Sequence, residues 1–187
     1  MLEKIQELDI NLLVYLNSLG SEKFDGFWLF ITDQLHWTPF FLFLFFMIYK
    51  KIGIKQTLYI LLFIAVLIAF TDQTTNLFKR TFERLRPCNN PDLKDIIRVV
   101  QVRNSYSFFS GHAANTMAVA TFLFLILKRH FKYFGFLFLW PLIFAYSRIY
   151  LGLHYPVDIL TGYFFGALFG SLLYLVYRKL KPQYFPG

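Results

Sequence analysis

The amino-acid sequence predicts an all-α membrane protein: a polytopic helical bundle with five or six transmembrane helices and an N-terminal amphipathic interfacial helix. Of the 187 residues, 57% are hydrophobic, including 25 phenylalanines and 12 tyrosines. The mean hydropathy of +0.48 is too high for a water-soluble domain of this length. Several apolar runs approach the roughly 20 residues that a helix needs to cross a bilayer. We therefore expect residues 1–187 to form a single integral membrane domain.

Residues 1–20 are predicted to form the interfacial helix. Apolar side chains recur there at helical spacing: Ile5, Leu8, Leu12, Leu13 and Leu16. Acidic and polar residues fill the intervals, a pattern typical of a helix that lies in the membrane surface rather than across it. Gly20 and Ser21 are expected to end this helix.

The next two spans are harder to delimit. Either a short half-helix precedes a span over about residues 37–51, or a longer broken helix starts near residue 24. A short basic loop follows, and residues 56–70 are apolar again. Beyond them polar residues recur at helical steps, which predicts that the helix continues to Pro87 with a polar stripe facing the bundle interior or a water-filled cleft. The stripe consists of Asp72, Thr75, Asn76, Lys79, Glu83 and Arg86.

The remaining chain contains one long polar connection and three further predicted spans. Residues 87–110 are expected to form an extramembrane loop over one end of the bundle, with a short helix at about 93–99. The spans are predicted over about 112–128, 133–150 and 156–178. In the last of them Gly162, Gly166 and Gly170 recur at four-residue steps, which is typical of close packing between helices.

Charges in the loops predict how the bundle is oriented. Three basic groups alternate along the chain with the other ends of the spans: Lys50, Lys51 and Lys55; Lys128, Arg129 and Lys132; Arg178, Lys179 and Lys181. Such groups favour the cytoplasmic side. The polar residues within 79–86, 110–112 and 148–158 are then expected to share the opposite face.

Net charge and cysteine content exclude some classes of function. The formal net charge is +8, and the cations lie at the ends of apolar runs rather than in a tail. This distribution suits anionic lipid surfaces and an anionic substrate, and nothing else indicates nucleic acid. The single cysteine, Cys88, has no partner for an internal disulfide or a cysteine metal site. No cleavable signal peptide is expected at the N-terminus.

Eight residues on the shared face have the properties of a phosphate pocket: Lys79, Arg86, Ser110, Gly111, His112, Arg148, His154 and Asp158. Three fixed cations in one cleft repel one another unless a multiply charged anion lies between them, and phosphate is the natural candidate. Ser110 and Gly111 directly precede a predicted helix, whose free backbone amides favour phosphate oxygens.

The two histidines suggest covalent chemistry on that phosphate. If Pro156 opens the last helix, His154 and Asp158 lie four residues apart beside one helical face, and the carboxylate can hold one ring nitrogen. An imidazole held in this way is a plausible nucleophile on phosphorus. The second imidazole, that of His112, can protonate the leaving oxygen.

These residues form three motifs that resemble the signature of the type 2 phosphatidic acid phosphatase family, which includes the vanadium haloperoxidases and glucose-6-phosphatase. The motifs are Lys79, six residues, Arg86-Pro87; Ser110-Gly111-His112; and Ser147-Arg148, five residues, His154, three residues, Asp158. The resemblance spans residues 79–158, and the N-terminal third matches only in being helical and membrane-associated. One departure is Phe109, where the family usually has proline.

The resemblance implies a metal-independent lipid phosphatase that forms a phosphohistidine and uses no cofactor. It implies that His154 is the nucleophile, Asp158 its orienting carboxylate and His112 the general acid. The phosphoryl oxygens would be held by Lys79, Arg86, Arg148, Ser110 and the amide of Gly111. Loss of proline at Phe109 puts only the rigidity of the loop in question, because proline supplies no chemical group.

The expected setting is a bacterial plasma membrane, with the active site on the periplasmic or external face. Membrane lipids are the expected partners, and no obligatory protein partner is expected. The compact length favours a bacterial origin. Undecaprenyl diphosphate is the first expected substrate, and phosphatidylglycerophosphate, phosphatidate and a lipid A phosphate are alternatives. Two other hypotheses remain: a metal-dependent hydrolase with His112, His154, Asp158 and Glu83 as ligands, and a phospholipid-binding or transport protein.

Overall fold

The computed structural model describes the backbone of residues 2–184 and the side chains of residues 3–180. Met1 and residues 185–187, which the predicted domain includes, lie outside the described residues. The described chain is helical and contains no strand. Its α-helices are α1 (Leu2–Ser18), α2 (Glu22–Thr32), α3 (Thr38–Phe82), α4 (Gly111–Leu127), α5 (Leu139–Tyr150) and α6 (Pro156–Tyr184).

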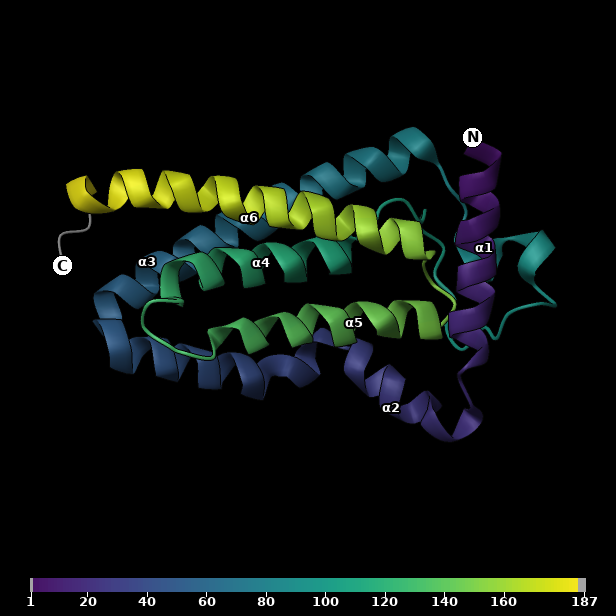
Figure 1. The fold of residues 1–187 in the computed structure, drawn as a ribbon, viewed down its shortest axis with the longest axis horizontal. Coiled ribbons are helices and arrows are strands. Elements are labelled where there is room, and N and C mark those ends of the chain that lie inside the picture. Colours follow the sequence, from purple (N-terminus) through teal and green to yellow (C-terminus); the bar gives the residue numbers. More distant parts are fainter. Residues whose placement is uncertain (1, 185–187) are drawn as a thin grey trace.

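The long helix α3 folds back on itself at Gly53, so that its two arms run in opposite directions (Figure 1). Gly53 has a φ of +80°, a conformation that side-chain-bearing residues rarely adopt. The arms of α3 lie along the bundle with α4, α5 and α6, whereas α1 crosses one end of the bundle nearly at right angles to it. That this helix lies in the membrane surface stays a prediction.

The ends of the helices alternate as the loop charges predict. The turn at Gly53, the C-terminal end of α4 and the C-terminal end of α6 lie at one end of the bundle (Figure 1). The start of α4, the end of α5 and the start of α6 lie at the other end, beside α1. The basic groups and the candidate site therefore occupy opposite ends. The side chain of Lys181, in the third basic group, lies outside the described residues.

Two helical stretches are long and apolar enough to cross a membrane: Gln34–Leu93, which contains the turn at Gly53, and Pro156–Leu180. The apolar helices at Gly111–Leu127 and Phe134–Tyr150 are shorter. The number of spans, five or six, stays a prediction. Of the two alternatives for the N-terminal region, the half-helix is confirmed, because α2 ends at Thr32 and a 3-10 helix at Gln34–Trp37 separates it from α3.

Two local predictions are wrong. Helix α3 ends at Phe82 rather than continuing to Pro87, because Glu83 has a left-handed conformation with φ of 45°. Arg86 therefore lies on an extended segment and not on the polar stripe of the helix. No helix forms over 93–99 either. The loop has only two single-turn 3-10 helices, Pro87–Asn89 and Pro91–Leu93, each with a proline at its start.

Helix α4 packs most extensively against α6, and the three glycines of α6 make this possible. A Cβ atom added to Gly162, Gly166 or Gly170 would lie 2.7, 2.4 or 2.5 Å from a backbone carbonyl oxygen of α4 or its N-cap. The prediction of close helix packing is confirmed. This contact fixes the start of α4 against the start of α6, where two of the three motifs lie.

Two polar residues of α1, Asp9 and Asn17, face the rest of the protein. Asp9 and Asn17 are 4% and 1% exposed, whereas Leu8 and Tyr15 on the other side are more than 60% exposed. The Asn17 side-chain amide donates to the carbonyl oxygens of Arg98, Ile149 and Tyr150 and accepts from the Arg98 backbone N–H. One asparagine thus joins the N-terminal helix to the long loop and to the end of α5.

The glycine packing generates a stability prediction. Gly166→Ala should lower the thermal stability of the purified protein, because its methyl group would collide with the carbonyl oxygen of Ala114. Overpacking typically costs about 1–3 kcal/mol. Gly26→Ala in α2 is the matched control, since a Cβ there meets nothing within 4 Å. Thermal unfolding in detergent measures both, and equal unfolding temperatures for the two variants would contradict the packing argument.

Candidate functional site

A tight turn between α5 and α6 places His154. Gly152 has a φ of +75°, and a Cβ at this position would lie 3.1 Å from the carbonyl oxygen of Arg98. The backbone N–H groups of Leu153 and His154 both donate to the carbonyl oxygen of Arg148. Pro156 then begins α6, as predicted. The imidazole of His154 is fully buried at this turn.

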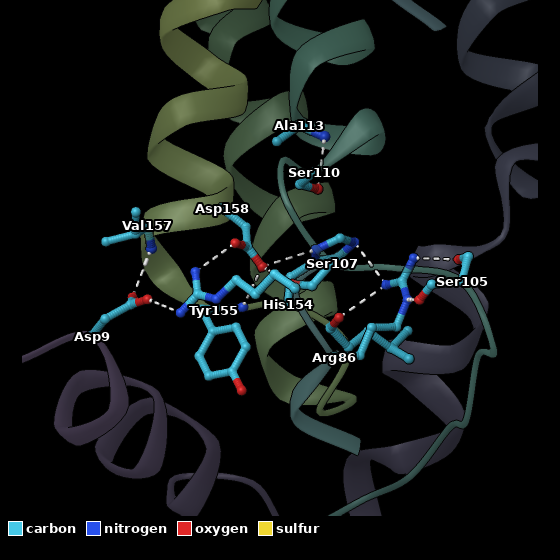
Figure 2. Close-up of polar contacts among 12 residues, drawn as sticks. Asp9, Arg86, Ser105, Ser107, Ser110, Ala113, His154, Tyr155, Val157 and Asp158 are labelled. Carbon is cyan, nitrogen blue, oxygen red and sulfur yellow. Dashed lines mark hydrogen bonds and ion pairs between the residues drawn. The ribbon is translucent and has the colours of Figure 1, made fainter. Parts of the chain in front are cut away.

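Asp158 holds His154 and is itself held by several donors (Figure 2). The Oδ2 atom lies 3.3 Å from Nδ1 of His154, accepts from the Tyr155 backbone N–H at 3.0 Å, and accepts from the Ser107 hydroxyl. The Oδ1 atom accepts from Nη1 of Arg84 at 2.8 Å. Because the carboxylate accepts from Nδ1, the neutral imidazole keeps its lone pair on Nε2.

Arg86 faces that Nε2 atom. Its Nη1 lies 2.9 Å from Nε2 of His154 and donates to the Leu153 carbonyl oxygen at 2.9 Å. Nε and Nη2 donate to the backbone carbonyl and the hydroxyl of Ser105, which fixes the plane of the guanidinium (Figure 2). The residue is only 4% exposed. A buried cation thus contacts Nε2 of His154, while Asp158 contacts Nδ1 on the other side of the ring.

Arg148 and Lys79 add two further positive charges around His154. Arg148 is 2% exposed and donates to the hydroxyl of Thr32, and its Nε has no hydrogen-bond partner among the described residues. Burial holds the pKa of His154 well below its usual value, and the charges of Arg86, Arg148 and Lys79 lower it further. The imidazole is therefore neutral beside three cations, an arrangement suited to a bound anion.

Lys79, Gly111 and His112 line a cavity of about 310 Å³ next to this cluster. The ring of His112 packs on that of Phe144, with centroids 5.5 Å apart. A second cavity of about 250 Å³ shares four lining residues with the first: Phe41, Ile68, Val119 and Trp140. Apart from the hydroxyl of Thr57 and the indole nitrogen of Trp140, its lining side chains are apolar. A polar and an apolar chamber therefore adjoin.

Ser110 joins the second motif to the third. Its hydroxyl caps α4 by accepting from the Ala113 backbone N–H at 3.4 Å, and its own N–H donates to the carbonyl oxygen of Asp158 at 3.1 Å. Phe109, in the place of the family's proline, is fully buried. Its ring stacks on Phe165 of α6 and meets Phe78 of α3 edge-on. Packing against two helices thus anchors this approach to Ser110.

The structure brings all eight predicted residues to one end of the bundle. It also reveals three residues that sequence reasoning missed: Asp9, Arg84 and Ser107. Arg84 donates to Asp158 with Nη1 and to Asp9 with Nη2 at 2.7 Å, and its guanidinium lies 3.7 Å from the ring centroid of Tyr155.

Asp9 and Ser107 complete the contacts around Arg84. Asp9 also accepts from the Val157 backbone N–H at 2.8 Å, at the start of α6. Burial raises the pKa of Asp9, and the hydrogen bond from Arg84 opposes that rise. Arg84 falls within the unspecified spacer of the first motif, and Asp9 lies on a helix predicted to serve the membrane surface. No sequence signal marked either residue.

The metal-hydrolase hypothesis requires several carboxylate and imidazole ligands to converge. Within the described part of the chain, no group of three or more His, Cys, Asp or Glu side chains lies close enough together to hold a metal ion. Glu83, one of the four proposed ligands, is the C-cap residue of α3. His154 instead contacts the guanidinium of Arg86, and the ring of His112 packs on Phe144.

Comparisons with known proteins agree with this geometry. The model of the PAP2 superfamily matches residues 56–182. A lipid A 4′-phosphatase of Bacteroides thetaiotaomicron is 34% identical over 188 aligned residues, which cover 98% of this chain and 83% of that protein. A lipid A 4′-phosphatase of Porphyromonas gingivalis is 33% identical, with coverage of 98% and 78%.

Two solved structures share the fold. A transmembrane PAP2-type phosphatidylglycerolphosphate phosphatase from Bacillus subtilis has a TM-score of 0.71 at 21% identity, covering 98% of this chain and 90% of that one. LpxE of Aquifex aeolicus has a TM-score of 0.68 at 24% identity, covering 89% and 94%. With its family match and its bacterial membrane relatives, this chain belongs to the PAP2 superfamily and is a membrane lipid phosphatase that hydrolyses phosphoric esters.

Proposed function

We propose that this protein removes the 4′-phosphate of a lipid A-type glycolipid in the bacterial plasma membrane, through a phosphohistidine formed on His154. One observation carries the proposal: Nε2 of the buried His154 contacts Arg86, with Lys79 and Arg148 near it, beside a cavity that adjoins an apolar chamber. A phosphate at the cations and acyl chains in the apolar chamber would match this distribution of polarity.

In the first half-reaction, Nε2 of His154 attacks phosphorus. A P–N bond forms, the P–O bond to the lipid breaks, and His112 gives a proton to the leaving oxygen. In the second, water attacks phosphorus, the P–N bond breaks, and His112 takes back a proton. Asp158 holds the ring and stabilises its positive charge when Nε2 is phosphorylated. No metal or cofactor is needed for either step.

Arg86 has a double role in this mechanism. Its Nη1 contacts Nε2 directly, so the lone pair is engaged before substrate arrives. A phosphate oxygen is a stronger acceptor than imidazole and would draw the guanidinium away from the nitrogen. Lys79, Arg148, the Ser110 hydroxyl and the Gly111 amide would bind the other phosphoryl oxygens. Positive groups aimed at the charge on the pentacoordinate phosphorus supply the largest expected catalytic effect.

The choice of lipid rests on the relatives. Both curated relatives at 33–34% identity are named lipid A 4′-phosphatases, which favours a lipid A phosphate over undecaprenyl diphosphate, our first expectation from sequence. Phosphatidylglycerophosphate and phosphatidate remain weaker alternatives. The basic groups at the end of the bundle opposite the site support a periplasmic active site in the inner membrane. We propose no obligatory protein partner.

Phosphate release from purified protein tests the substrate and the mechanism together. Lipid A should lose its 4′-phosphate faster than undecaprenyl diphosphate, phosphatidylglycerophosphate or phosphatidate loses phosphate, and EDTA should not change these rates. His154→Ala should reduce the rate by more than about 1,000-fold, because it removes the nucleophile. Binding of lipid A to this variant should persist, since the three cations remain.

Each part of this proposal has its own contrary result. Undecaprenyl diphosphate as the preferred substrate would overturn the choice of lipid. Loss of activity with EDTA, restored by a divalent metal, would favour the metal-hydrolase hypothesis. Undiminished activity of His154→Ala would refute the phosphohistidine. Lipid binding by the native protein without any phosphate release would favour the binding or transport hypothesis.

Arg84 is expected to be a positioning residue for this reaction, acting through Asp158. Arg84→Gln should lower kcat by about ten- to hundredfold, because a hydrogen bond to a charged group contributes about 1.5–3 kcal/mol. KM should change little, since Arg84 faces the carboxylate and not the cavity. Arg84→Lys should restore part of the rate by keeping the charge. Steady-state kinetics on lipid A measure kcat and KM for the native protein and for both variants.

Arg80→Gln is the matched control, because Arg80 is an exposed arginine one turn before Arg84 in the chain. It should leave kcat and KM unchanged. A fall in kcat for Arg84→Gln that occurs only together with a loss of folded protein, judged by thermal unfolding, would assign Arg84 a structural role instead.

A further inference from the structure

The cavity lined by Lys79 and His112 also contains polar side chains that the proposed mechanism does not use. Gln34, Asp72, Asn76 and Asn115 line it together with Lys79 and His112. Two other polar residues of the lining are engaged by their own helices: the hydroxyl of Thr75 donates to the Thr71 carbonyl oxygen, and that of Thr116 to the His112 carbonyl oxygen. The unused groups are therefore one carboxylate and three amides.

Asp72 and Asn115 form a pair across the cavity, from α3 and α4. The Asn115 amide nitrogen donates to Oδ1 of Asp72 at 2.6 Å, which fixes the orientation of the amide. The other end of that amide, Oδ1 of Asn115, is covered and has no hydrogen-bond partner among the described residues. A buried acceptor without a donor is costly, and a ligand hydroxyl reached by a small rotation of the side chain would satisfy it.

The carboxylate and the three amides that line this cavity match a neutral, hydroxyl-rich headgroup. A hydroxyl both donates and accepts, so it can pair with a carboxylate or with either end of an amide. Trp37, Trp140 and Phe144 give the same cavity flat apolar surfaces against which the C–H face of a sugar ring can pack. A few placed polar groups within a largely apolar lining are typical of a site that fixes the orientation of a small group.

The same polar side chains disfavour binding of a second phosphate group. Asp72 is the only carboxylate among the described residues that line the cavity, and it precedes Lys79 of the cationic cluster by about two helical turns of α3. The second phosphate of a diphosphate lipid would be repelled by this carboxylate. Sites that accept diphosphates need further cations there, and here the next groups are amides.

From these observations we infer that Asp72 and Asn115, with Asn76 beside them, form a subsite that binds the sugar ring next to the scissile phosphate and selects glycolipid phosphates over diphosphates. This inference rests on the proposed function and identifies residues that would recognise the proposed substrate. The reacting phosphate is held by one end of the cavity, and the sugar hydroxyls are read by the other.

The test compares two monophosphates that carry the same reacting group. Purified full-length protein is assayed with an acylated glucosamine disaccharide 4′-phosphate and with phosphatidate of matched acyl length. Asp72→Ala and Asn115→Ala should each lower kcat/KM for the disaccharide by about tenfold or more, mainly by raising KM, and leave phosphatidate within about twofold. Any effect transmitted through Lys79 would fall on both substrates, because both bind it through phosphate.

Two further variants separate the effect of the Asp72 charge from the effect of a substitution at this place on α3. Asp72→Asn should raise kcat/KM for undecaprenyl diphosphate above that of the native protein, because the repelling charge is removed and the side-chain shape is kept. Gln73→Ala is the matched control: Gln73 is exposed beside Asp72 and does not line the cavity. This variant should leave kcat/KM unchanged for all three substrates.

The outcomes separate the subsite from the proposed function. If the native protein hydrolyses phosphatidate but not the disaccharide phosphate, the proposed substrate fails, and the subsite fails with it. If the native protein hydrolyses the disaccharide phosphate but Asp72→Ala and Asn115→Ala reduce both substrates equally or neither, the subsite alone is overturned. Selective loss of the disaccharide activity supports both.

Discussion

The site depends on one buried carboxylate. Asp158 is fully buried, and an unpaired charge there would be strongly destabilising, so its partners must be in place for the end of the bundle to fold. Those partners come from distant parts of the chain: Arg84 after α3, Ser107 in the long loop, and the backbone at the start of α6. Satisfying this one group therefore assembles the segments that carry the three motifs, with His154 held as a consequence.

The N-terminal helix is part of this assembly, although it lies outside residues 56–182 that match the family. Through Asp9 it holds Arg84 and the start of α6, and through Asn17 it holds the long loop and the end of α5. Leu13 of this helix packs in the core, whereas Leu8, Leu12 and Tyr15 are exposed. A helix predicted only to rest on the membrane thus also holds the segments around His154 in place.

The sequence was sufficient for much of this architecture, for identifiable reasons. Hydropathy and Pro156 located α6, and the i to i+4 spacing of His154 and Asp158 gave their contact because both lie at one helix start. Periodicity failed at Glu83, where one left-handed residue ended a helix that its pattern would have continued. Arg84 and Asp9 could not be found, because their pairing joins residues 75 positions apart and neither spacing nor composition encodes such a contact.

The position of the apolar cavity next to the polar one bears on how a lipid reaches the enzyme. Drawing an acyl chain out of a bilayer into water costs about 0.8 kcal/mol per methylene, which is prohibitive for a molecule with several chains. A cavity lined by Phe41, Leu44, Ile60 and Leu61 offers hydrocarbon surroundings next to the cavity that contains Lys79 and His112. Lateral diffusion would then deliver the headgroup to the cations while the tails stay solvated by apolar groups throughout, so turnover would require no extraction of the lipid.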